Sequence, residues 1–199
     1  MSGSFFSKLE DKLGVHQQPL KERLALVMYR LRSLRNKIES NSLMLQRRDK
    51  ELFDKCVAAR TSGDSARANL YAAECAEVRN IAKVVLQSEL AIEQLIFKLE
   101  TTEILGYIAF LVRPVKTVVA AVGDHVKQLM PEISFELGQI NETLDGLVVD
   151  AGNVSETMTV TSVTTVDAEK ILTEANVLAE QKIKSRFPEL QPSATAVPT

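Results

Sequence analysis

The side chains in this 199-residue chain that could do chemistry are mainly carboxylates, and many of them gather in the middle of the sequence. Six glutamates recur there: Glu74, Glu77, Glu89, Glu93, Glu100 and Glu103. Carboxylates on facing helices can hold two iron ions, but such a site also needs Glu-x-x-His pairs. The chain has only two histidines, His16 and His125, and neither completes a pair. We therefore interpret the glutamates as a solvated acidic face.

Other catalytic signatures are also absent from the sequence. It has no glycine-rich loop with the Lys and Ser or Thr that bind phosphate, and no pair of histidines at the spacing of metal ligands. Asp124 and His125 are adjacent, which favours a local surface pair over a catalytic one. The sequence thus predicts a protein that is not an enzyme, with no catalytic residue, no metal site and no cofactor.

Charge is distributed unevenly along the chain, although the net charge is only −2. The first 60 residues hold 13 Lys and Arg against 7 Asp and Glu, whereas the remaining residues hold 11 against 19. The sequence pI near 5.8, and the lack of stacking aromatics among the basic residues apart from Tyr29, argue against nucleic acid as a partner. The chain therefore has a basic front and an acidic rear.

A basic stripe is expected within the front segment. At 100° per residue on a helix, five basic residues fall within about 40° of one another, and no acidic residue of that helix shares their arc. They are Arg23, Arg30, Lys37, Arg48 and Lys55. Such a stripe suits a flat polyanion such as an anionic membrane surface. A row of salt bridges toward the acidic rear would explain it as well, and the two roles are compatible.

A long helix is needed to align these residues. After Pro19, apolar residues over 20–56 recur mostly at alternating spacings of three and four, which is a heptad seam. Pro19 predicts the start of this helix and residues 62–64 (Ser-Gly-Asp) predict its end. A second apolar run, 65–113, should end or kink at Pro114. Each seam can be buried only against another helix, so we predict an all-α fold built on a long antiparallel helical hairpin.

Shorter helices are expected in the rest of the chain. Apolar spacing predicts helices over 115–130, 132–149 and 167–187, the last with Asp167 as its N-cap. Residues 153–166 are rich in Thr, Ser and Val; we interpret them as a linker, because a lone strand would have no partner. We expect five parts: an N-terminal amphipathic segment (1–17), a helical core (18–150), a flexible linker (151–166), a C-terminal amphipathic helix (167–187) and a proline-containing tail (188–199).

The N-terminal segment could add a second membrane contact. Phe5, Phe6 and Leu9 give it an apolar side, and Gly14 is expected to end it. A short amphipathic segment enters a lipid interface only weakly on its own. Folding back on the hairpin is the alternative.

No segment is expected to span a membrane. The most apolar window, 104–122, carries Arg113 and Lys116 at its centre, where each charge would cost about 2.5 to 3.5 kcal/mol on insertion. No secretory signal opens the chain. Cys56 and Cys75 would be offset along the hairpin, so we predict two unpaired thiols in a reducing compartment.

The order of these features resembles the ESCRT-III family. A basic first helix of about forty residues, a tight turn, an acidic second helix, short following helices, a linker and a proline-containing tail together are typical of it. The segment 129–134 (Leu-Met-Pro-Glu-Ile-Ser), followed by the amphipathic stretch 135–149, is similar to archaeal cell-division members of the CdvB type. The resemblance covers residues 18 to 190 and rests on architecture and charge order.

The resemblance implies a function and partners. Such proteins are cytoplasmic monomers that polymerise with themselves and with paralogues on the inner face of the cell membrane, at the division site, where they constrict or sever membrane necks. It also implies an AAA+ ATPase with an MIT domain (CdvC-like) that grips a C-terminal motif. Residues 187–192 resemble such a motif, with Phe187, Pro188, Leu190 and Pro192 as its contact residues.

The basic front and the acidic rear of the chain suggest how a monomer could be held in a closed conformation, with its later helices packed on the first helix. We expect an acidic region to lie against the first helix and mask the basic stripe until the monomer opens. Its residues are Glu132, Glu136, Glu142, Asp145 and Asp150. A cytosolic coiled-coil scaffold without membrane activity is the alternative function. It explains the seam and the charges, but not the ordered succession of shorter helices, linker and tail.

Overall fold

The computed structural model describes residues 3–101, 108–152 and 163–187, with side chains over 22–101, 112–147 and 167–187. Five helices account for almost all of these residues: α1 (Gly3–Thr61), α2 (Ser65–Thr101), α3 (Ile108–Val126), α4 (Pro131–Gly152) and α5 (Val163–Arg186). The described residues contain no strand, so the predicted all-α fold is confirmed.

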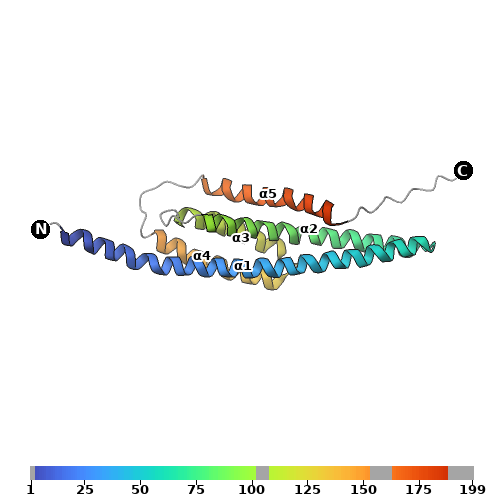
Figure 1. The fold of residues 1–199 in the computed structure, drawn as a ribbon, viewed down its shortest axis with the longest axis horizontal. Helices are drawn as coiled ribbons and strands as arrows, with labels where there is room; N and C mark the ends of the chain where they lie inside the picture. Colours follow the sequence, from blue (N-terminus) through green and yellow to red (C-terminus); the bar gives the residue numbers. More distant parts are fainter. Residues whose placement is uncertain (1–2, 102–107, 153–162, 188–199) are drawn as a thin grey trace.

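The two longest helices, α1 and α2, form the predicted antiparallel hairpin (Figure 1). The apolar seam of α1 is buried along it, with Val27, Leu31, Leu34, Ile38 and Leu52 almost inaccessible to solvent. Their spacing of three and four residues keeps one side of a helix facing its neighbour. The heptad pattern of the sequence therefore identified the contact that defines the fold.

A glycine turn reverses the chain between α1 and α2. The N–H of Asp64 donates to the carbonyl of Ala59 (2.9 Å), and the N–H of Gly63 donates to that of Arg60 (3.2 Å), which is a Schellman motif. Gly63 takes a φ of 81°, a conformation that favours glycine. A carboxylate oxygen of Asp64 then accepts the N–H of Arg67 (3.0 Å) and caps α2. The predicted stop at residues 62–64 is confirmed.

The predicted helix boundaries were wrong at two prolines. α1 begins at Gly3 and continues through Gly14 and Pro19, although Pro19 was expected to start it. α2 ends at Thr101, and Pro114 lies inside α3 instead of ending the second helix. Proline costs about 3 kcal/mol inside a helix. In α3 this cost is offset by burial of the valines around it: Val112, Val115, Val118 and Val119.

The last two helices follow their predicted ranges more closely. α4 begins at Pro131, which suits a first helical turn, and includes the predicted range 132–149. α5 begins at Val163, four residues before the expected N-cap Asp167, so that prediction was wrong. Asp167 instead lies in the first part of the helix and forms an ion pair with Lys98 of α2 (3.1 Å). Most of the predicted linker (153–162) lies outside the described residues.

The shorter helices cover one half of the hairpin (Figure 1). α4 packs on α1 and α3, while α5 packs on α2 and α3. One continuous core joins all five helices in this half. The other half of the hairpin extends beyond them, and its buried residues are mostly small: Leu52, Ala59, Ala68, Cys75 and Ala82. The molecule therefore has a packed bundle at one end and a bare two-helix tip at the other.

Cys56 and Cys75 both carry free thiols. The thiol of Cys56 donates to the carbonyl of Ala68 (3.3 Å), and that of Cys75 to the carbonyl of Asp49 (3.8 Å). Burial raises the pKa of the Cys75 thiol. Among the described helices, none has an apolar stretch long enough to cross a lipid bilayer.

Replacing Gly63 by alanine should destabilise the protein by about 1 to 2 kcal/mol, because alanine is strained at positive φ. The matched control is Gly138→Ala in α4, where an added methyl group would meet open space. This control should stabilise the protein by about 0.5 to 1 kcal/mol. Urea denaturation of both variants, followed by circular dichroism, measures the difference. Equal stability of the two variants would contradict the role of Gly63.

Candidate functional site

The predicted basic stripe is divided by the fold into a covered part and an open part. Arg23, Arg30 and Lys37 lie where α4 packs on α1, whereas Arg48 and Lys55 lie on the tip of the hairpin beyond α4. All five residues lie on one side of α1. α4 packs along that side of the helix but does not extend to the tip of the hairpin. α4 is the helix that carries the predicted acidic region, and it lies beside only part of the stripe.

The covered part of the stripe meets α4 at three points. The Lys37 ammonium lies 2.6 Å from a carboxylate oxygen of Glu136. Arg30 and Glu136 line the same groove of about 190 Å³ between the two helices. Farther along, the guanidinium of Arg23 approaches α4 at Gly146, where an added Cβ would lie 3.6 Å from its Nη1. This is the distance of an ordinary van der Waals contact, so Arg23 lies directly beside α4.

The open part of the stripe lies on the tip beyond α4, but its Arg48 side chain (52% exposed) is no more accessible than that of Lys37 (51% exposed), so the two parts differ in whether α4 is a neighbour and not in exposure. Arg48 is about half exposed and makes long contacts with Glu51 (3.8 Å) and Glu74 of α2 (4.0 Å). Lys55 is exposed, and it has no ion-pair partner among the described side chains. Exposed pairs at these distances contribute little to stability. Both cations can therefore turn toward an external anion at low cost.

The predicted acidic region faces the stripe only in part. Glu136 contacts Lys37, and Glu132 lines a hollow of about 470 Å³ beside the same lysine. Asp145 instead pairs with Lys116 of α3, and Glu142 is exposed on α4. These residues alternate between two sides of α4, so one helix cannot present them all to α1. The side chain of Asp150 lies outside the described residues, as do those of Phe5, Phe6 and Leu9.

α5 is held on α2 by small buried residues and polar pairs. Ala168, Ala175 and Ala179 let the two helices approach closely. Lys83 pairs with Glu180 (2.9 Å), and this hydrogen bond lowers the pKa of the Glu180 carboxyl. Gln87 donates to the amide oxygen of Asn176. The many short contacts fix α5 along the bundle end of α2.

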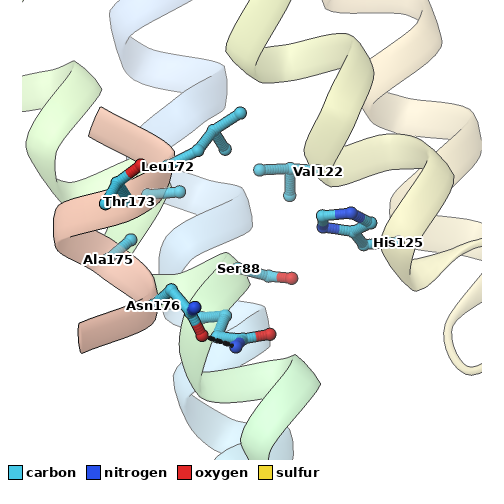
Figure 2. Close-up of a pocket in the computed structure, with 9 residues that line it drawn as sticks. Ser88, Val122, His125, Leu172, Thr173, Ala175 and Asn176 are labelled. Carbon is cyan, nitrogen blue, oxygen red and sulfur yellow. Dashed lines mark hydrogen bonds between the residues drawn. The ribbon is translucent and has the colours of Figure 1, made fainter. Parts of the chain in front are cut away.

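A pocket of about 330 Å³ lies between α2, α3 and α5. Figure 2 shows Leu172, Thr173, Ala175 and Asn176 of α5 on one side and Val122 and His125 of α3 on the other. No charged side chain and no cluster of metal-ligating residues lies in it among the described residues. We assign no chemistry to this pocket.

The predicted tail motif begins in a buried position. Phe187 is 7% exposed, and its ring centroid lies 5.9 Å from the guanidinium carbon of Arg79 on α2. Arg79 is itself fixed by two hydrogen bonds to Asp49 of α1 (2.6 and 3.1 Å). In this conformation Phe187 is therefore packed against the hairpin. Pro188, Leu190 and Pro192 lie outside the described residues.

Glu89 was missed by the sequence analysis, which placed it on a solvated acidic face. It is 4% exposed on α2, and its Oε2 has no hydrogen-bond partner. Burial raises the pKa of its carboxyl, and Arg186 and Lys182 of α5 partly oppose this shift. The sequence signal was the apolar context, since residues 84–86 and 90–92 are all apolar.

Comparison with known proteins shows which protein family the chain resembles in sequence. Cell division protein B1 of Sulfolobus acidocaldarius is 38% identical to the chain over 179 residues, which is 90% of this chain and 84% of that protein. The chain belongs to the family of the archaeal cell division protein B. Cell division protein B of the same organism is 28% identical over 189 residues, covering 95% and 71% of the two chains. No family model and no solved structure matches the chain.

Membership in this family supports a role in cell division. The matches extend over nine-tenths or more of the chain, so they cover the hairpin and most of the helices packed on it. The predicted resemblance to CdvB-type proteins is confirmed.

Glu89→Gln should raise the melting temperature at pH 7. Because the pKa of this carboxyl is raised in the folded state, the native protein carries a costly buried charge above that pKa, and glutamine removes it. As pH falls through the folded pKa, the native state binds the proton before the unfolded state does. The advantage of glutamine should therefore vanish near pH 4.

Thermal unfolding at pH 7 and pH 4 measures this effect, and exposed Glu77→Gln is the matched control. A lower melting temperature of Glu89→Gln at pH 7 would mean that the contacts with Arg186 and Lys182 outweigh burial.

Proposed function

We propose that this protein is a membrane-associated, polymer-forming subunit of ESCRT-III type that constricts or severs membrane necks during cell division. The observation that carries the proposal is the division of the basic stripe, with Arg48 and Lys55 on the bare tip and with Arg23, Arg30 and Lys37 beside α4. Family membership supports the division role. In this account the described conformation is the closed monomer.

The free energy that holds α4 against α1 is small enough for this contact to open and close. An exposed pair such as Lys37 with Glu136 contributes about 0 to 1 kcal/mol, so this pair alone cannot hold α4 in place. The hold comes from apolar residues of α4 that are shared between α1 and α3: Ile133, Leu137, Ile140, Leu144 and Leu147. α4 can leave α1 while remaining packed on α3, which keeps part of this burial.

Membrane binding supplies a compensating free energy. Each Lys or Arg near an anionic surface contributes about 1 kcal/mol, so the three cations beside α4 together add at most about 3 kcal/mol once α4 no longer keeps a flat surface away from them. Polymerisation adds to this because neighbouring subunits bind the same surface. Binding to the membrane thus stabilises the open form, and opening in turn strengthens binding to the membrane.

The bare tip suits contacts with other copies of the chain and with paralogues. Met44, Val57 and Leu70 are each 50% to 60% exposed there, on a part of the hairpin that no other described helix covers. Exposed apolar side chains on a two-helix rod are a common feature of surfaces that associate. We place self-assembly on this tip.

The rest of the proposal concerns where in the cell the protein acts and what remodels its polymer. The protein acts in the cytoplasm, as a peripheral protein on the inner face of the cell membrane at the division site. An AAA+ ATPase with an MIT domain remodels the polymer through the tail motif of Phe187, Pro188, Leu190 and Pro192. The role of the protein itself is structural and not catalytic.

Reversing the two open cations, Arg48→Glu together with Lys55→Glu, should lower co-sedimentation with anionic vesicles at least tenfold. The charge of the tip changes by four units, and each unit is worth about 1 kcal/mol near such a surface. The matched control, Lys170→Glu with Lys184→Glu, makes the same change at exposed positions of α5.

Electron microscopy of the same samples separates the alternatives. Filaments on anionic vesicles, lost in the tip variant and kept in the control, are expected. A discrete soluble dimer with no filaments on any vesicle would favour the cytosolic scaffold instead.

Glu136→Lys should increase binding to anionic vesicles, because it replaces the weak attraction to Lys37 by a like-charge repulsion and so raises the population in which α4 has left α1. Glu142→Lys is the matched control: it makes the same charge change on an exposed position of α4 that has no ion pair with α1 among the described side chains. Sedimentation at several salt concentrations measures both. Equal gains from the two variants would show that α4 does not mask the stripe.

A further inference from the structure

The outer face of α4, which points away from the core of the bundle, carries an exposed aromatic ring among acidic residues. Phe135 lies two residues from both Ile133 and Leu137, which are buried, so its side chain leaves the opposite side of the helix. It is 68% exposed. Glu132 and Glu142 are exposed within about 60° of it around the helix axis, and neither forms an ion pair with another described side chain. α4 contains no Lys or Arg, so this face is purely acidic.

A groove of about 440 Å³ on α1, next to the end of α5, has the opposite charge. Leu43 and Phe53 give it an apolar surface. Arg47 and Lys50 line it as well, and both are exposed without an ion-pair partner among the described side chains. The groove is separate from the basic stripe, since none of the five stripe residues lines it. We call it the α1 groove.

The α1 groove is positive overall. Two carboxylates lie in its lining, Asp49 and Asp54. Asp49 is 2% exposed and is neutralised by two hydrogen bonds from Arg79. Asp54 is then left against three cations, because Arg186 of α5 lines the groove too. An apolar surface rimmed by cations fits an aromatic side chain that is flanked by carboxylates.

Like surfaces of two copies would repel each other. Two outer faces of α4 brought together would place Glu132 and Glu142 against the same carboxylates of the other copy. Two α1 grooves would do the same with Arg47 and Lys50. Like charges brought together at an interface suppress association, whereas complementary ones favour it. The charges therefore favour contact between unlike surfaces.

We propose that the outer face of α4 in one copy of the chain packs in the α1 groove of the next copy. Phe135 lies against Leu43 and Phe53 in this contact, and the two carboxylates beside it face the two exposed cations of the groove. The lengths agree, since residues 132–142 of α4 rise by about 15 Å and residues 43–54 of α1 by about 16 Å. A buried aromatic anchor surrounded by polar contacts is typical of interface hot spots.

The two surfaces of one copy do not face each other. Lys37 contacts Glu136 of α4, and Lys50 lies thirteen residues farther along α1. This spacing places Lys50 about 140° around the helix and about 20 Å along it. α4 and the α1 groove therefore lie on different sides of α1. Repeating a contact between two different surfaces gives an open filament unless the rotation closes a ring.

This inference rests on the proposed function, because it assigns two surfaces to the proposed polymer. The side of α4 that carries Phe135 is not the side that contacts α1 through Glu136. It is therefore available whether α4 lies on α1 or has left it. Copies can join through this contact without first opening.

Photo-crosslinking in the full-length chain tests the contact. The exposed Phe135 is replaced by the photoreactive residue p-benzoylphenylalanine, and isotopically light and heavy chains are mixed on vesicles of phosphatidylserine and phosphatidylcholine. Only the vesicle-bound fraction is irradiated, so that a change in membrane binding does not alter the yield. Crosslinks between light and heavy chains, to residues 43–53, are expected. Crosslinks to other residues, crosslinks only within single chains, or none at all would overturn the proposal.

A charge exchange provides the second arm. Glu132→Lys with Glu142→Lys gives one variant, and Arg47→Glu with Lys50→Glu gives the other. Each variant alone has two surfaces of like charge, so its crosslinking yield should fall at least threefold. An equal mixture of the two variants pairs opposite charges at every contact and should recover the yield of the unreversed chain. A mixture that crosslinks no better than either variant alone would contradict the contact.

Electron microscopy of the unmodified protein on the same vesicles separates failure of this contact from failure of the proposed function. Filaments together with crosslinks at other residues would refute only the contact between α4 and the α1 groove. The absence of both filaments and vesicle binding would refute the proposed function, and this contact with it.

Discussion

The burial of one apolar seam along α1 is the constraint on which the rest of the structure depends. On an isolated helix the apolar seam of these 59 residues would be exposed to water, so the seam needs a partner along most of its length. α2 provides that partner, and the Schellman turn at Gly63 brings it back antiparallel. Because α3, α4 and α5 are shorter, they can cover only half of the hairpin. The contrast between a packed bundle and a bare tip follows directly from these lengths.

The polar pairs between helices differ in how firmly they add to this apolar packing. Asp49 and Arg79 form a buried bidentate pair inside the tip half, and Arg79 presents its guanidinium to Phe187 at the end of α5. Removing one partner of a buried pair costs about 3 to 5 kcal/mol, so this contact is a firm anchor. Lys37 with Glu136 is exposed and weak by comparison. The contrast makes the α1–α4 contact easier to open than the hairpin.

The sequence predicted features that depend on local pattern and missed those that depend on tertiary context. The three-and-four spacing predicted the hairpin, and Ser62-Gly63-Asp64 predicted the turn, because both signals act within one helix or one turn. Pro114 was misjudged because the burial of four neighbouring valines, which offsets its cost, is not visible in the chain. Asp145 was predicted from its charge to face the basic stripe as part of the acidic region, yet its side of α4 meets Lys116. The burial of Glu89 and of Phe187 was missed because it depends on which helices pack over them in the folded protein.

The central claim is that α4 lies against α1 beside Arg23, Arg30 and Lys37 in the closed monomer, keeps a flat membrane away from them, and leaves α1 at an anionic membrane. The most direct test is the distance between spin labels at Asn36 of α1 and Gln139 of α4, both exposed, in a chain carrying Cys56→Ser and Cys75→Ala. Pulsed electron paramagnetic resonance should give one short distance in solution and with neutral vesicles, and a longer distance with anionic vesicles. An unchanged distance on anionic vesicles to which the protein is bound would contradict the account.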